Sequence, residues 1–329
     1  MQQEKVIIIG AGPCGMAAAI ALQEQGINPL IIEKDNIVNT LYEFPTHQTF
    51  FSSSDKLEIG DVAFITEKQR PVRNEALTYY REVAKRKDLR INAFEKAEQV
   101  TKLDSSFEII TVNRQNAQKK YSAQFVIMAT GYYDQPNNLH VPGDDLSKVL
   151  HYFKEAHPYY NKNVVIIGGK NSAVDAALEL HKAGAKVTVL YRGDSYSTSI
   201  KPWILPGFDS LAKKEMINLV FQANVTKIID DAVYYDVDGK EKKIQNDFVF
   251  AMIGYQPDIP FLHELGIKTD SITGIPHFNE ETYESNIKDV YLAGVVTAGF
   301  NNNSIFIENG RFHGNIIAND IRTKVEAIV

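Results

Sequence analysis

The stretch that decides the fold is residues 6–15, V-I-I-I-G-A-G-P-C-G. Four apolar residues typical of a buried strand lead into glycines spaced G-x-G-x-x-G, and apolar residues at helical spacing follow. After a stop at Gly26, residues 29–33 read as a second strand that ends at Glu33. This order predicts a β-α-β unit that binds a dinucleotide.

Each position of this turn has a predicted role at the dinucleotide. Gly10 permits the tight turn, Gly12 lets the backbone approach a pyrophosphate, and Gly15 lets the helix pack close to the strand. Glu33 lies 23 residues after Gly10 and can accept hydrogen bonds from a ribose diol. The complete strand, turn, helix and acid therefore favour a dinucleotide site over an ordinary glycine-rich turn.

Residues 163–192 repeat the same plan, with G-G-K-N-S-A at 168–173 as the turn between a strand and a helix. Gly168 and Ala173 occupy the first and third small positions, but Lys170 stands where the second glycine is expected. Its side chain could crowd a pyrophosphate or, being cationic, neutralise it. A β-α-β unit that binds nothing stays open as the alternative.

Arg192 ends the second strand of this repeat, at the place that Glu33 holds in the first. A guanidinium suits the dianion of a 2′-phosphate, which a carboxylate would repel, although Asp194 nearby counts against this interpretation. The second unit therefore favours NADPH over NADH.

Composition excludes several classes of protein. The 329 residues suffice for two domains, and 35 basic against 41 acidic residues give a net charge of −6. This balance is not that of a protein that binds nucleic acid or a membrane surface. One cysteine cannot form an internal disulfide, and we find neither a signal-peptide pattern nor a membrane-length apolar run. We expect a cytoplasmic protein.

An acidic ribose-binding unit followed by an NADPH unit predicts an α/β flavoprotein with two Rossmann-like domains, the NADPH domain inserted into the FAD domain. Three further apolar strands with small turns, at 125–131, 248–254 and 290–294, fit this plan. A Gly- and Asn-rich loop then leads into a predicted helix from about Ile305, whose first N–H groups would be free. The predicted domains are 1–135 and 259–329 for FAD, and 136–258 for NADPH.

With these motifs, the chain resembles the two-domain flavoprotein reductases of the low-molecular-weight thioredoxin reductase type over nearly its whole length. Three stretches are similar to the bacillithiol disulfide reductases within that group: 10–15, 168–173 and A-G-V-V-T-A-G at 293–299. The resemblance implies FAD and NADPH as cofactors. The predicted cofactor-binding residues are, in the FAD domain, Gly10, Gly12, Pro13, Gly15, Glu33, Lys34, Thr46, Gly131, Gly294, Ser304 and Ile305, and, in the NADPH domain, Gly168, Lys170, Asn171, Ser172, Ala173 and Arg192.

Two departures from the thioredoxin reductase pattern limit what the resemblance implies. Residues 132–167 contain no cysteine, so the C-x-x-C dithiol of that family is absent and a dithiol relay is excluded. The usual acid after the C-terminal glycine is also missing, because Val295 follows Gly294. Other groups must complete FAD binding.

Cys14 is the predicted catalytic residue, and packing is the alternative. A helix N-terminus lowers the pKa of a thiol, whereas the neighbouring pyrophosphate would raise it, and buried cysteines usually behave as small apolar residues. The resemblance implies a redox role, because the proposed active cysteine of the family matches Cys14.

The expected reaction passes hydride from NADPH to the flavin and two electrons to a low-molecular-weight disulfide, with Cys14 holding a mixed disulfide. The resemblance implies bacillithiol disulfide as this small-molecule substrate. We expect a homo-oligomer, the default for this class of enzyme, and no nucleic-acid or membrane partner. No metal is expected, because His47, His151 and His157 lack the spacing of metal ligands.

Three other interpretations share these motifs. Flavin monooxygenases have the same plan, although Val149 and His151 replace part of their usual fingerprint. A ferredoxin or flavodoxin NADP reductase lacks a dithiol and needs no cysteine. The third is a redox-sensing protein that holds FAD without turnover.

Overall fold

The structure is a computed structural model that describes residues 1–301 and 303–327, and the chain divides into two compact units. The first unit consists of 1–42, 48–135 and the chain from Tyr255 onward, and the second of 43–47 and 136–254. The second unit thus interrupts the first. It ends four residues earlier than the predicted boundary at 258, and it also takes up the short segment 43–47.

Backbone hydrogen bonds explain where the two units divide. Asn137 N–H donates to Gly254 O at 3.0 Å inside the second unit, and Gln256 N–H donates to Gln135 O at 2.9 Å inside the first. The crossings at 135–136 and 254–255 lie between these two bonds. The predicted boundary after residue 258 came too late because Gln256 already pairs with the first unit.

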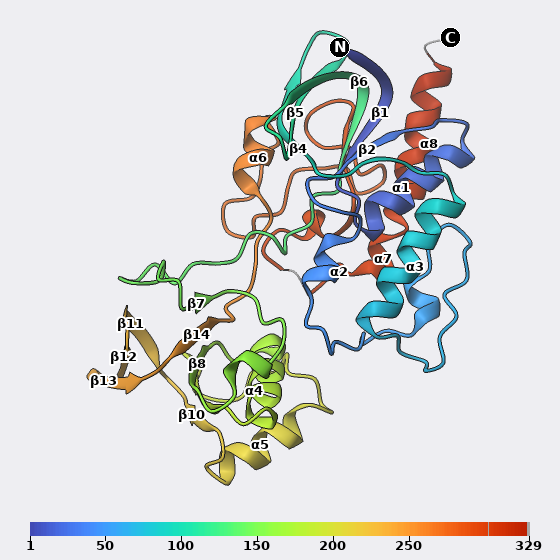
Figure 1. Cartoon of the computed structure of the whole chain (residues 1–329). Helices are drawn as coiled ribbons and strands as arrows, with labels where there is room; N and C mark the ends of the chain where they lie inside the picture. Colours follow the sequence, from blue (N-terminus) through green and yellow to red (C-terminus); the bar gives the residue numbers. More distant parts are fainter. Residues whose placement is uncertain (302, 328–329) are drawn as a thin grey trace. The chain divides into compact units, whose positions relative to one another are not determined.

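A seven-stranded sheet forms the core of the first unit, in the order β3-β2-β1-β6-β5-β4, with β15 also paired to β6 (Figure 1). The pairs β1·β2, β2·β3, β1·β6 and β6·β15 are parallel, whereas β4, β5 and the start of β6 form an antiparallel meander. The strands are β1 (Gln2–Ile9), β2 (Leu30–Ile32), β3 (Arg90–Asn92), β4 (Glu95–Lys102), β5 (Phe107–Asn113), β6 (Gln118–Met128) and β15 (Val290–Leu292).

Helices α1 and α8 lie side by side in this unit (Figure 1). Their contact is close: a Cβ atom on Gly314 would lie 2.5 Å from Ala18 Cα, so only glycine allows the two backbones to approach this far. The helices of the unit are α1 (Pro13–Glu24), α2 (Asn39–Glu43), η1 (Ser54–Leu57), α3 (Arg73–Arg86), α6 (Ile259–Glu264), η3 (Gly294–Ala298), α7 (Ile307–Gly310) and α8 (His313–Glu326).

The second unit contains a parallel sheet in the order β10-β9-β8-β14-β7 and a small antiparallel sheet, β11-β12-β13 (Figure 1). Its strands are β7 (Val149–Leu150), β8 (Asn163–Ile167), β9 (Lys186–Leu190), β10 (Asn218–Val220), β11 (Asn224–Ile229), β12 (Ala232–Val237), β13 (Lys240–Gln245) and β14 (Phe248–Ala251). Its helices are η2 (His157–Tyr159), α4 (Asn171–Lys182) and α5 (Leu205–Lys213). The predicted α/β fold with one Rossmann-like domain inserted into another is confirmed.

The helix predicted from about Ile305 begins at Ile307 and is divided into two parts. Only four residues, Ile307–Gly310, form α7, and the long helix α8 begins at His313. Asn309 closes the short turn, because its Oδ1 accepts the Phe306 N–H at 2.7 Å and its Nδ2 donates to Ser304 O at 2.9 Å. Of the N–H groups at this helix start, that of the N-cap residue Phe306 is already bonded. No described helix has the length and apolar character needed to cross a membrane.

Candidate functional site

The first glycine turn lies at the carboxyl ends of β1 and β6, where parallel strands diverge and ligands bind in open α/β sheets. Ile9 pairs with Met128, so the two strands end side by side. Gly10 has a φ of +110°, and a Cβ atom there would lie 2.4 Å from Ala129 O. The neighbouring turn therefore requires glycine at this position.

Gly15 and Gly12 meet opposite environments. A Cβ atom on Gly15 would lie 2.0 Å from Gly10 O, so α1 packs against the turn itself. A Cβ atom on Gly12 would meet nothing within 4 Å. The open space at Gly12 is what a bound pyrophosphate requires, and Pro13 starts the helix that follows.

Glu33 is buried, at 8% exposure, directly after β2. Its Oε2 accepts the Ala11 N–H at 2.7 Å and its Oε1 accepts the Asp35 N–H at 2.9 Å. Burial raises the pKa of this carboxyl, and the two backbone donors oppose the rise. Besides its predicted role at a ribose, Glu33 therefore holds the glycine turn in shape.

The thiol of Cys14 lies between two glycines from the C-terminal part of the chain. A Cβ atom on Gly294 or on Gly310 would lie 2.9 Å from Sγ. Although the residue as a whole is partly exposed, burial of the thiol raises its pKa to about 12. Desolvation of the thiolate thus opposes the lowering of this pKa that a helix N-terminus favours. Here we call Cys14, Gly294 and Gly310 the thiol seat.

His313 is a further residue of this region, and sequence reasoning missed it. It is 4% exposed, and its Nδ1 accepts the Gly294 N–H at 3.2 Å. Burial lowers the pKa of its imidazole to about 4, so the ring is neutral near pH 7. A single histidine at the start of a helix carries no sequence signal of such a contact.

Four other residues predicted to bind FAD differ in their positions and partners. Gly131 follows β6 in an open turn, and Ile305 Cγ2 lies 3.2 Å from where a Gly310 Cβ would be, next to the thiol seat. Lys34 forms an ion pair with Asp134. Ser304 donates its hydroxyl to Asn301 O at 3.0 Å.

Thr46 belongs to the second unit rather than the first. Its N–H donates to Lys154 O at 2.9 Å, and the Lys154 ammonium pairs with Glu43 at 3.1 Å. The structure therefore places Thr46 in a different unit from the glycine turn with which it was predicted to act, because this backbone bond holds 43–47 on the second unit.

The second glycine turn repeats the geometry of the first. Ile167 of β8 pairs with Ala251 of β14, and Gly168 has a φ of +135°. A Cβ atom on Gly168 would lie 2.3 Å from Met252 O. Ala173, fully buried, takes the third position. This turn also lies at the carboxyl ends of neighbouring parallel strands.

The polar residues of the second turn divide into structural and accessible ones. Asn171 is structural, because its Nδ2 donates to Ser199 O at 2.8 Å and its Oδ1 accepts the Lys201 N–H at 2.9 Å. Lys170, Ser172 and Arg192 are exposed. Within residues 1–301 and 303–327, the Lys170 ammonium and the Arg192 guanidinium form no ion pair or hydrogen bond. Two uncommitted cations therefore lie at this turn.

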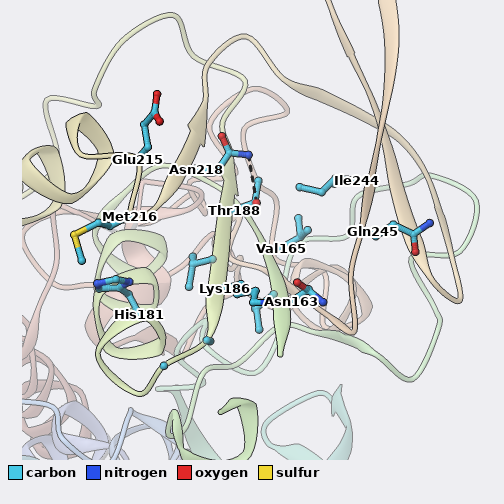
Figure 2. Close-up of a pocket in the computed structure, with 14 residues that line it drawn as sticks. Asn163, Val165, His181, Lys186, Thr188, Glu215, Met216, Asn218, Ile244 and Gln245 are labelled. Atoms are coloured by element: carbon cyan, nitrogen blue, oxygen red, sulfur yellow. Dashed lines mark hydrogen bonds between the residues drawn. The ribbon is translucent and has the colours of Figure 1, made fainter. Parts of the chain in front are cut away.

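A hollow of about 590 Å³ lies at the other end of the same sheet (Figure 2). Asn163 and Lys186, the first residues of β8 and β9, line it, as do Thr188 and Asn218, which share a 3.4 Å hydrogen bond. Cofactors bind at the carboxyl ends of parallel strands, so this hollow is not part of the predicted nucleotide site. Among the described residues, no group of three His, Cys, Asp or Glu side chains could hold a metal ion.

Comparisons with known proteins extend these observations. Residues 7–294 match the family model described as pyridine nucleotide-disulphide oxidoreductase. The chain is 59% identical over 322 residues to bacilliredoxin reductase Bdr of Bacillus subtilis, covering 98% of both chains. It is similar to the solved structure of bacillithiol disulfide reductase Bdr (YpdA) from Bacillus cereus, with a TM-score of 0.97, 58% identity and 98% and 100% coverage. It is also similar to the solved structure of bacillithiol disulfide reductase Bdr (YpdA) from Staphylococcus aureus. The TM-score is 0.94 and the identity 57%, and the match covers 98% of this chain and 99% of the other.

Proposed function

Because the chain belongs to the pyridine nucleotide-disulphide oxidoreductase family, as an oxidoreductase flavoprotein with FAD and NADPH as cofactors, we propose that it reduces bacillithiol disulfide. The full-length similarity to two bacillithiol disulfide reductases, at 58% and 57% identity, carries this proposal. The net reaction consumes one NADPH and one proton, cleaves the sulfur–sulfur bond and releases two thiols.

The first glycine turn has the features that FAD requires. Gly12 offers open space for the pyrophosphate, and the free start of α1 offers backbone N–H groups. Glu33 keeps lone pairs on both oxygens beyond its two backbone bonds, so it can also accept a ribose hydroxyl. FAD, when bound, supplies the two-electron chemistry between NADPH and a disulfide.

The second turn has the features that NADPH requires. The uncommitted Arg192 guanidinium presents a planar set of donors for a 2′-phosphate, and the Lys170 ammonium lies at the start of α4, beside the predicted pyrophosphate. Asn171 contributes indirectly, because its bonds to the 199–201 loop hold that loop against the helix start.

The geometry of the thiol seat bears on whether Cys14 forms a mixed disulfide with the substrate. A mixed disulfide would join Sγ to one sulfur of the substrate and release the other half as a thiol. That step requires a reachable thiolate, whereas the thiol lies against Gly294 and Gly310 with a pKa raised to about 12. The protein must therefore open the thiol seat, or the electrons reach the disulfide without Cys14.

The first experiment measures NADPH oxidation by the FAD-loaded protein with and without bacillithiol disulfide. We expect disulfide-dependent oxidation with two thiols formed per NADPH. Cys14→Ala is the matched variant, because it removes only the sulfur from a small site, and its flavin content is measured in parallel. Disulfide turnover that disappears in this variant while flavin content and flavin reduction persist makes Cys14 a redox centre.

Two other outcomes separate the alternatives. Full turnover by Cys14→Ala assigns the cysteine to packing and leaves disulfide reduction in place. If the disulfide has no effect while ferredoxin or oxygen accepts electrons from NADPH, the ferredoxin reductase or monooxygenase interpretation replaces the proposal. The burial of Cys14 is the one observation that favours a cysteine-free reaction.

We further propose a cytoplasmic homo-oligomer. A reductase that draws on NADPH keeps thiols reduced, which suits the reducing compartment of the cell, and enzymes of this size commonly form symmetric oligomers. Analytical ultracentrifugation of the FAD-loaded protein at several concentrations tests the oligomer, and a single species of the 37.0 kDa chain mass would contradict it.

A further inference from the structure

The Gly294 end of the thiol seat makes two hydrogen bonds outside the regular sheet: its carbonyl accepts the Thr297 hydroxyl at 2.9 Å, and its N–H donates to the His313 ring. After β15, the Ala293 N–H still donates to Met128 O at 2.9 Å, but the chain then turns away from the sheet at Gly294. The Gly294 N–H is buried and donates instead to His313 Nδ1 at 3.2 Å. Without this acceptor, a buried backbone donor would be unsatisfied, which is costly in a folded protein.

The imidazole of His313 is fixed in the orientation that this bond needs. Its ring stacks on Tyr283, with centroids 4.1 Å apart and planes at 21°, and Tyr283 stacks on Phe278 at 5.6 Å. Nδ1 can accept a hydrogen bond only when it carries no proton itself, so the neutral ring has its hydrogen on Nε2. The column of three rings therefore aims an acceptor at Gly294.

The helix that carries His313 is also tied to the helix that carries Cys14. His313 is the first residue of α8, and the next residue, Gly314, approaches Ala18 of α1 so closely that an added Cβ would lie 2.5 Å from its Cα. The acceptor, the Gly294 turn and the thiol are thus placed by one packed arrangement within the first unit.

We propose that His313 is the positioning residue of the thiol seat: its bond to the Gly294 N–H keeps the Gly294 turn closed against Cys14. Opening of the seat then requires this bond to break or the turn to move with the ring. The inference deepens the proposed function, since it names the residue that controls access of a disulfide to Cys14. It does not depend on which disulfide the enzyme reduces.

The test is the rate at which a thiol reagent labels Cys14 in the FAD-loaded protein at one fixed pH. Cys14 is the single cysteine of the chain, so every labelled thiol reports on the seat. His313→Phe keeps a ring that can stack on Tyr283 but removes the acceptor. His313→Asn removes the ring but places an amide oxygen where Nδ1 was.

We expect His313→Phe to label about tenfold faster than wild type or more, because the unsatisfied Gly294 N–H favours open states of the turn. His313→Asn should stay within about threefold of wild type, since it restores an acceptor. Ile317→Val is the matched control: it loosens the same helix at a fully buried position without touching the bond. The proposal is overturned if His313→Phe labels no faster than a control of equal melting temperature, or if the Asn and Phe variants label alike.

A measurement on the wild-type protein guards against a variant that does not fold. Hydrogen exchange of the Gly294 amide should be slow at neutral pH, because the N–H is buried and bonded. Fast exchange of this amide in an otherwise protected protein would also overturn the proposal. Failure of the proposed function gives a different result, since bacillithiol disulfide would then leave NADPH unchanged while the labelling pattern stayed as expected.

Discussion

Two turns of this molecule share one backbone and differ in what surrounds it. After β1, the Gly10 N–H donates to Ile32 O at 2.9 Å, and after β8 the Gly168 N–H donates to Leu190 O at 3.0 Å. On the other side, the Ala129 N–H donates to Ile9 O and the Met252 N–H to Ile167 O, both at 2.8 Å. The repeated β-α-β plan therefore produces the same turn twice.

The surroundings give the two turns different chemistry. The first contains the desolvated thiol of Cys14, both Glu33 and His313 are buried, and its third position tolerates only glycine. The second presents exposed, uncommitted cations, and alanine fits its third position. Burial fixes the shape of the first turn, whereas the exposed cations of the second turn remain available to bind a highly charged ligand.

The largest loss of stability should come from replacing the third small residue of a glycine turn. Gly15→Ala would put a Cβ 2.0 Å from Gly10 O, and we expect a loss of about 4 kcal/mol in unfolding free energy because a backbone carbonyl must move. Ala173→Gly removes one buried methyl from a helix and should cost about 1–2 kcal/mol. Denaturant unfolding of both variants with FAD bound measures the difference. Equal losses would show that the two turns are packed alike.

The next effect is a pH dependence that arises from His313, beside the first turn. The pKa of His313 is about 4 in the folded protein, below its ordinary value of 6.5, so the unfolded state binds a proton more readily between these values. Its stabilising contribution is complete above pH 6.5 and falls as the pH drops toward 4, by about 2 kcal/mol between pH 7 and pH 5.

The measurement for this pH dependence is the unfolding free energy of wild type and His313→Asn across that range. The raised pKa of Glu33 has the opposite sign, but it is present in both proteins and cancels in the difference. Two parallel profiles would contradict the prediction.

A smaller effect concerns cofactor choice at the second turn. Arg192→Ala should raise the KM for NADPH about tenfold and leave the KM for NADH unchanged, because an exposed guanidinium contributes modestly to a 2′-phosphate contact. Steady-state kinetics with both cofactors and an artificial dye acceptor measures this. An equal change for both cofactors would place Arg192 away from the 2′-phosphate.

The smallest effect decides between the two roles of Lys170. If the ammonium neutralises the pyrophosphate, Lys170→Gly weakens NADPH binding about threefold, and added salt weakens the wild type more than the variant. If the side chain crowds the ligand, the restored glycine binds NADPH more tightly. Because Lys170 is exposed, the melting temperature should not change in either case, and titration of NADPH at two salt concentrations distinguishes the roles.

Local patterns predicted the strands and helices around the two glycine turns, because a β-α-β turn is specified by a short stretch of sequence. The strands that end at Ile9 and Ile167 and the helices that follow were predicted from period and glycine spacing. The helix predicted from about Ile305 begins at Ile307, and α7 ends at Gly310 before α8 begins at His313. The bonds of Asn309 to Phe306 and Ser304 cap the start of α7, and composition alone does not reveal the break that follows.

The sequence by itself determined the family, the two glycine turns, the absence of a dithiol and the likeness to bacillithiol disulfide reductases. Each of these depends on residues close together in the chain, or on composition. Tertiary structure alone decided that the Cys14 thiol is desolvated and that His313 accepts the Gly294 N–H. The groups that enclose the thiol, Gly294 and Gly310, are about 280 to 300 residues away in the chain, and desolvation depends on what is packed in space.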